Sequence, residues 1–197
     1  MRESTPTGRI GREPLSPAAA PTPSMLSLLV AVLLLGAADA QLPDDNWSGF
    51  SSMGVVNDIV PAGGMVWAAT DGGVLRYDVS ERTYSRFTRV DGLAGSRVLT
   101  AVADGGGDLW FGTSGEGLSR WVVASGEFTG PFSEFEGLEL NDLAVFDGGL
   151  YIASNIGVSL FLTDLERVKE NYRQFGSMTR DSPVAAVAVR GGRIWAG

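Results

Sequence analysis

Aromatic residues recur in this sequence at an interval of a little over forty residues, and this period restricts the fold more than any other feature. Each of them follows two adjacent glycines after one or two intervening positions. They are Trp67, Trp110, Tyr151 and Trp195, and they stand 43, 41 and 44 residues apart. A constant order of such anchors indicates a repeated supersecondary unit, which buries its apolar faces by stacking on its neighbours.

Each repeat holds four short segments in which apolar residues alternate or run together. In the first repeat they span 55–60, 66–70, 74–78 and 84–88. In the second they span 98–103, 109–113 and 118–123, with a weaker one near Phe128, and in the third 140–146, 150–154, 158–162 and 171–175. Glycine-rich turns separate them. The pattern predicts an all-β fold, a β-propeller built from four-stranded antiparallel blades.

The recurring large and small residues have a natural place in such a fold. Both faces of a blade are buried, so a large ring on one sheet needs a small residue beside it to admit the neighbouring sheet. We expect Trp67, Trp110, Tyr151 and Trp195 to be the packing rings. The small residues two positions later are Ala69, Gly112 and Ala153. Stacking of the tryptophans on a sugar is the alternative role.

The sequence before the first repeat predicts export. Residues 1–24 form a leader of disordered composition, and 25–40 form a signal peptide whose apolar run, 26–36, ends before the small residues Ala38 and Ala40. An uncleaved membrane anchor is the alternative. Residues 41–53 are a lead-in segment. We therefore expect a periplasmic, cell-surface or extracellular protein that meets a membrane only through its signal segment or through regions outside this chain.

Composition removes several classes of function. The net charge is −8 and the chain has one lysine, Lys169, so it lacks the basic face that nucleic acids require. Cysteine and histidine are absent, which excludes thiolate nucleophiles, imidazole bases and Cys/His zinc sites. We expect a protein that is not an enzyme and carries no cofactor or metal, although paired carboxylates would still permit a carbohydrate-active enzyme.

Polar residues at the first strand of each repeat are the candidate ligand contacts, because propeller ligands commonly meet the innermost strands. They are Asn57, Asp58, Arg97, Thr100, Asn141 and Asp142. Counted back from the aromatic anchor, Asn57, Thr100 and Asn141 occupy the same place. A ring of such groups would suit a glycan or peptide. The alternative is that they cap the entry to the strand by bonding nearby backbone.

The run Asp104-Gly-Gly-Gly-Asp108 raises the question of calcium, because two carboxylates stand close together in it. The spaced acidic pattern of a calcium loop and its distal glutamate are missing. We therefore expect a turn at this place.

The second repeat resembles the repeat of two-component regulator propellers. The matching positions are Gly92-Leu93, Asp104, Gly107, Leu109-Trp110, Gly112-Thr113 and Gly117-Leu118. The resemblance covers 54–197 and is weaker in the third repeat, which has Tyr151 and Ser154. It implies one of two settings: the periplasmic sensor region of a hybrid histidine kinase, whose ligand is often derived from a polysaccharide, or a surface protein such as a component of the type IX secretion system.

We expect the partial propeller at 54–197 to divide into blades at 54–95, 96–139 and 140–182, with a truncated blade at 183–197. About three and a half blades leave two blade faces uncovered, so further blades from sequence beyond Gly197 are expected partners. A ligand-binding sensor module is our first hypothesis and a surface or secretion-associated interaction module the second. A propeller enzyme is the third.

Overall fold

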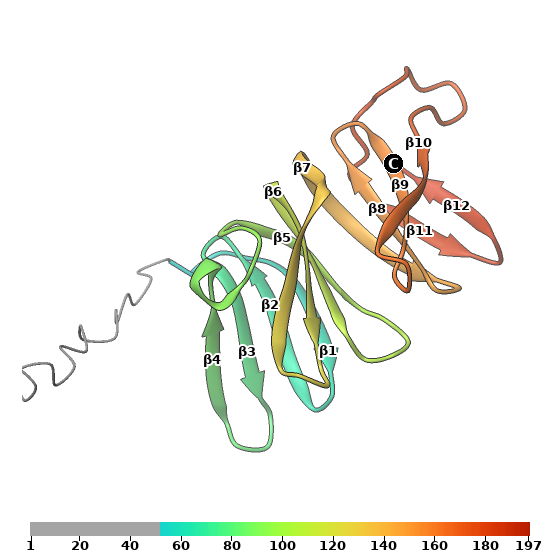
Figure 1. Ribbon diagram of the computed structural model, residues 1–197. Helices are drawn as coiled ribbons and strands as arrows, with labels where there is room; N and C mark the ends of the chain where they lie inside the picture. The colour runs from blue at the N-terminus through green and yellow to red at the C-terminus, as the bar shows by residue number, and fades with distance from the viewer. Residues whose placement is uncertain (1–51) are drawn as a thin grey trace, which may run out of the picture. The chain divides into compact units, whose positions relative to one another are not determined.

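The computed structural model describes residues 52–197, and strands make up almost all of its secondary structure (Figure 1). The only helical element in that part of the chain is a 3₁₀ turn, Arg89–Asp91. The expected leader at 1–24, the signal peptide at 25–40 and nearly all of the lead-in at 41–53 lie outside the described residues. The prediction of an all-β fold with antiparallel sheets is confirmed.

The first sheet is a four-stranded meander in the order β1-β2-β3-β4. Its strands are β1 (Val56–Ala62), β2 (Met65–Thr70), β3 (Gly73–Asp78) and β4 (Thr83–Phe87). They lie within two residues of the segments expected for the first repeat. Gly63 and Gly64 join β1 to β2 with φ of 59° and 78°, a two-residue turn that residues with a side chain rarely form.

The chain from residue 98 to 172 forms one six-stranded sheet, in the order β10-β9-β8-β7-β6-β5. Two separate four-stranded blades were expected here. The strands are β5 (Val98–Ala103), β6 (Leu109–Val122), β7 (Glu127–Phe146), β8 (Gly149–Ser154), β9 (Gly157–Leu162) and β10 (Arg167–Tyr172). The expected boundary between 139 and 140 falls inside β7.

The two long strands, β6 and β7, change neighbours along their length. The first part of β6 pairs with β5, and its second part pairs with the first part of β7. The second part of β7, from Leu140 onward, pairs with β8. Three register shifts interrupt the pairing of β6 with β7, so the strands bend without ending. We call 98–132 the second repeat and 140–172 the third.

The last strand of the third repeat begins earlier than expected, at Arg167 rather than at residue 171. Glu166 adopts a left-handed conformation, with φ of 47°, and this tight turn returns the chain to pair at once with β9. The polar run at 167–172 tolerates the exposed edge position. After it, β11 (Val187–Arg190) and β12 (Arg193–Ala196) form a two-stranded hairpin, which we call the last hairpin.

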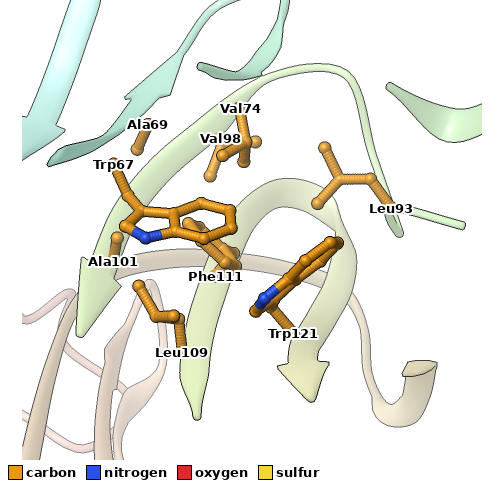
Figure 2. Close-up of a cluster of buried hydrophobic side chains, with 9 residues drawn as sticks. All are labelled: Trp67, Ala69, Val74, Leu93, Val98, Ala101, Leu109, Phe111 and Trp121. Carbon is orange, nitrogen blue, oxygen red and sulfur yellow. The ribbon is translucent and has the colours of Figure 1, made fainter. Parts of the chain in front are cut away.

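Hydrophobic clusters lie between successive repeats. The first joins Trp67 of the first sheet to Phe111 and Trp121 of β6, whose ring centroids lie 6.1 and 5.2 Å from that of Trp67 (Figure 2). The second joins Trp110 of β6 to Phe161 of β9, at 5.6 Å. Adjacent residues of β6, Trp110 and Phe111, thus enter different clusters, because successive side chains of a strand point to opposite faces.

The four recurring aromatics differ in their burial. Trp67 and Trp110 are 3% and 0% exposed, and Tyr151 is partly buried against the third cluster, which the last hairpin completes. Trp195, however, is 51% exposed. Each of the other rings packs on the repeat that follows it, whereas within residues 52–197 β12 pairs only with β11.

The small residues Ala69, Gly112 and Ala153 are all buried. Gly112 shows most directly why a small residue is needed. A Cβ atom at this position would lie 2.8 Å from Cγ2 of Thr100 and 2.9 Å from Cβ of Leu140 in the third repeat. These separations are shorter than carbon atoms tolerate, so the hydrogen side chain of Gly112 allows the third repeat to approach β6.

Candidate functional site

A β-bulge lies near the start of the first strand of each repeat. The pairing shifts register between Val56 and Asp58, between Val98 and Thr100, and between Leu140 and Asp142. The unpaired residues are therefore Asn57, Leu99 and Asn141. A bulge bends its strand and redirects the side chain of the extra residue, and at two of these three positions that side chain is an amide.

The first bulge connects the first sheet to the second repeat. The Asn57 side-chain amide donates to the Val98 carbonyl oxygen at 2.7 Å. The Asp58 carboxylate accepts from the Ala101 backbone N–H at 2.9 Å and from the Thr100 hydroxyl at 3.2 Å. Its other oxygen accepts from the Ile59 N–H at 2.7 Å. Asn57 and Asp58, which were both predicted as ligand contacts, thus form hydrogen bonds to the second repeat.

The third bulge repeats this arrangement toward the last hairpin. The Asn141 amide donates to the Val184 carbonyl oxygen at 2.9 Å, and the Asp142 carboxylate accepts from the Val187 N–H at 2.8 Å. We call each pair, Asn57 with Asp58 and Asn141 with Asp142, an Asn–Asp clasp. Each clasp binds backbone groups of the following repeat. The capping alternative expected bonds to nearby backbone, whereas these bonds join two successive repeats.

The second bulge carries Leu99 and Thr100 and forms no clasp. Counting back from the aromatic anchor aligned Thr100 with Asn57 and Asn141. The strand pairing shows that this alignment is off by one position. Thr100 pairs with Gly112 as Asp58 pairs with Ala69 and Asp142 with Ala153. Between equivalent cross-strand pairs, the connection from β5 to β6 (Ala103 to Leu109) is one residue longer than that from β1 to β2 (Pro61 to Val66), which shifts any count made from the aromatic anchor.

Arg97 joins the first clasp through a residue that the sequence analysis missed, Asp71. One oxygen of the Asp71 carboxylate accepts from the Asn57 amide at 3.0 Å and from Nε of Arg97 at 3.2 Å. The hydrogen bond from Asn57, with that from Arg97 and its positive charge, lowers the pKa of Asp71 below its usual value of 3.8. Asp71 stands in a turn after β2, where the sequence gives no sign of a distant partner.

Asn57 and Arg97 are the predicted contacts that are exposed to solvent, and we call them, together with Asp71, the polar triad. The Arg97 and Asp71 side chains are 56% and 37% exposed. Among the described residues 52–197, Arg97 is bonded through Nε alone, so its terminal nitrogens are available there as donors. A triad of this kind can hydrogen-bond hydroxyl or peptide groups.

No cluster of three acidic residues capable of holding a metal occurs within 52–197. The carboxylate of Asp104, considered above for calcium, is committed to its own turn and to a ring. It accepts from the N–H groups of Gly106 and Asp108 at 2.9 and 3.1 Å, and from Nε1 of Trp110 at 3.0 Å. The expected turn is present at this position.

The predicted contacts therefore separate into two groups. Asn57, Asp58, Arg97 and Thr100 come together at the junction of the first sheet with the second repeat. Asn141 and Asp142 lie at the junction of the third repeat with the last hairpin, and within residues 52–197 no hydrogen bond or ion pair joins them to the first group.

Comparison with known proteins gives matches among solved structures alone. No family model and no curated protein matches the chain. The extracellular domain of the hybrid two-component system BT4673 from B. thetaiotaomicron is 20% identical over 73% of this chain and 19% of its own, with a TM-score of 0.60. That of the hybrid two-component system BT3049 from the same organism is 22% identical over 78% of this chain and 22% of its own, with a TM-score of 0.59.

A third match is PorZ, a bacterial surface component of the type IX secretion system of Porphyromonas gingivalis. It is 16% identical over 74% of this chain and 20% of its own, with a TM-score of 0.59. The chain thus spans about a fifth of the length of these structures. The resemblance to two-component regulator propellers is confirmed at the level of the fold.

Among residues 52–197, no helix is long and apolar enough to cross a membrane.

Proposed function

We propose that this chain is an exported recognition module that acts without catalysis, and that it forms the N-terminal part of the sensor region of a two-component regulatory protein. The observation that carries the proposal is the fold it shares with the extracellular domains of two hybrid two-component systems, over 73% and 78% of its length. The apolar run at 26–36, followed by small residues, supports export.

The polar triad is the recognition surface in this proposal. Its exposed guanidinium and carboxylate suit the hydroxyl groups of a glycan or the backbone of a peptide. The absence of cysteine and histidine from the whole sequence supports a role without covalent or acid–base chemistry. A propeller enzyme working through carboxylates is a more distant reading, which turnover of a glycan would favour.

A surface or secretion-associated interaction module is the second candidate. Its support is the likeness to PorZ, which has nearly the same TM-score as the two sensor domains. The gene sequence beyond Gly197 distinguishes the two. A membrane helix followed by a histidine-kinase pattern would support the sensor, and a C-terminal sorting domain would support the surface module.

Export is tested by fusing the 197-residue chain to an alkaline phosphatase that lacks its own signal. We expect phosphatase activity in the periplasm of a Gram-negative host, because the enzyme is active only after export. Leu34→Arg, inside the apolar run, should abolish the activity, and Leu165→Arg, at an exposed turn, should not. Activity that survives Leu34→Arg would contradict an export signal at 25–40.

Recognition is tested with immobilised glycans and peptides. We expect at least one class to bind, and Arg97→Gln to weaken that binding because it removes the exposed guanidinium. Arg193→Gln, an exposed arginine of the last hairpin, is the matched control. Binding that Arg97→Gln leaves unchanged would exclude the polar triad, and no binding to either class would refute the recognition proposal.

A further inference from the structure

A cavity of about 320 Å³ lies between the first sheet and the second repeat, at the opposite end of β1 from the polar triad. Its walls include Ala62, Met65, Trp67, Arg76, Leu109 and Trp121. The volume is at the lower limit for small-molecule sites, which are mostly apolar and hold a few well-placed polar groups. The cavity fits this description.

The guanidinium of Arg76 is the charged group of the cavity. Its Cζ lies 5.5, 5.2 and 5.7 Å from the ring centroids of Trp67, Phe87 and Trp121. Its hydrogen-bond partner is a neutral hydroxyl, that of Ser85, at 3.3 Å from Nη2. No carboxylate within residues 52–197 forms an ion pair with it.

Asp78 is the carboxylate whose ionisation Arg76 affects. Its pKa is lowered chiefly by hydrogen bonds from the Glu81 backbone and from Ser80, with a smaller effect of the Arg76 charge. One oxygen of Asp78 already accepts three hydrogen bonds, two from Ser80 and one from the Glu81 N–H. Asp78 thus serves its own turn and leaves the guanidinium without a bonded counter-charge.

The indole N–H groups of Trp67 and Trp121 have no hydrogen-bond partner in the described part of the chain. No side-chain nitrogen in that part is both fully buried and unsatisfied, so these two donors reach solvent. Figure 2 shows the two rings on either side of Phe111, with Leu109 close to both. Three hydrogen-bond donors, the Arg76 guanidinium and the two indole N–H groups, therefore border this largely apolar cavity.

The equivalent junction between the second and third repeats shows what is missing from this cavity. There Arg120 lies 5.1 Å from the ring centroid of Trp110, as Arg76 lies over Trp67. Arg120, however, pairs with Asp108 at 2.7 Å and with Glu166 at 3.2 Å. Nε1 of Trp110 donates to Asp104 at 3.0 Å. Both donors are satisfied by the protein itself.

The strand registers identify the corresponding residues of the first junction. Val66 pairs with Pro61 as Leu109 pairs with Ala103, so Met65 takes the place of Asp108, and Ala62 takes the place of Asp104. The arginine and the tryptophan are retained, and the carboxylates that would satisfy them are replaced by apolar residues that line the cavity.

We propose that this cavity binds a small organic acid, whose carboxylate pairs with Arg76 and accepts from an indole N–H. Its apolar body lies against Met65 and Leu109. A carboxylate supplies the acceptor oxygens that Asp104 and Asp108 supply at the next junction, and the methionine and leucine walls favour an aliphatic or aromatic body. This site is separate from the polar triad, so it does not depend on the proposed function.

The test uses 3-phenylpropionate as the probe and the 197-residue chain, with binding measured by calorimetry. The neutral 3-phenylpropanol has the same body, and acetate has the same charge. We expect 3-phenylpropionate to bind at least about tenfold more tightly than either, because charged hydrogen bonds and apolar burial both contribute. Equal affinity for the alcohol, or no binding of 3-phenylpropionate at millimolar concentration, would overturn the proposal.

Variants locate the site. Met65→Asp places a carboxylate where Asp108 stands at the next junction, and it should abolish binding by neutralising Arg76 within the fold. Arg76→Gln should also abolish it. Arg86→Gln is the matched control, because Arg86 is an exposed arginine of the same sheet that lies over Tyr84 at 5.5 Å. Unchanged binding by folded Met65→Asp, or loss of binding in Arg86→Gln, would refute this assignment.

Discussion

The side-chain amide of Asn57 donates a hydrogen bond to the carbonyl oxygen of Val98, 41 residues further along the chain, at 2.7 Å. Asn141 repeats this bond with Val184, 43 residues on, at 2.9 Å. In both cases the next residue is an aspartate that accepts from a backbone N–H of the same following repeat. The Asn–Asp clasps therefore set the position of one repeat against the next.

Loss of a clasp carboxylate should destabilise the fold. Asp58→Ala leaves the Ala101 N–H without its acceptor, and Asp142→Ala does the same to Val187. We expect each to lower the free energy of unfolding by about 1 to 3 kcal/mol, the usual cost of an unmade hydrogen bond in a partly buried place. Urea denaturation measures it. Asp164→Ala, at an exposed turn, is the control, and an equal effect of all three variants would contradict the role of the clasps.

A methyl group at Gly112 should disturb the approach of the third repeat. Its Cβ would overlap Thr100 and Leu140, and overpacking of this kind costs about 1 to 3 kcal/mol. We expect Gly112→Ala to lower the thermal midpoint measured by calorimetry. Gly105→Ala provides the comparison, because no atom lies within 4 Å of a Cβ at that position. An unchanged midpoint in Gly112→Ala would show that the two repeats are not in close contact there.

The pKa of Asp71 should depend on Asn57. The Asn57 amide is the first cause of its lowered value, followed among the lowering effects by Arg97. Because the folded-state pKa is depressed, the stability linked to this group is present above the usual pKa and is lost as the pH falls through the folded-state value. We expect Asn57→Ala to move the pKa of Asp71 upward, as followed by NMR titration of its carboxyl carbon. A value unaffected by Asn57→Ala and by Arg97→Gln would contradict the triad.

The fold was predictable where a period marks it. The strand positions of the first repeat follow from alternation and from glycines that permit a tight turn, both of which are local properties. The union of β6 and β7 into a six-stranded sheet was not predictable, because register shifts allow a chain to bend within a strand instead of ending it. The exposure of Trp195 was not predictable either, because the burial of a ring depends on which distant residues pack on it. The sequence around Trp195 does not specify those residues.

The candidate site was only partly predictable. The asparagine and aspartate of each clasp stand out because they are polar residues at the start of an apolar strand. Thr100 was misaligned, because the length of one turn differs and a sequence count cannot detect where the extra residue lies. Asp71 was missed, since its bonds to Asn57 and Arg97 span 14 and 26 residues. The cavity beside Arg76 emerges only when the strand registers of two repeats are compared.

The account as a whole depends on aromatic rings that pack one repeat against the next. Its most direct test is the free energy of unfolding of Trp110→Ala beside that of Trp195→Ala, measured by urea denaturation of the 197-residue chain. Trp110 is fully buried, so we expect a loss of about 3 to 5 kcal/mol. Trp195 is 51% exposed, and we expect a change of no more than about 0.5 kcal/mol. Equal, small losses in the two variants would show that the recurring rings do not hold the repeats together.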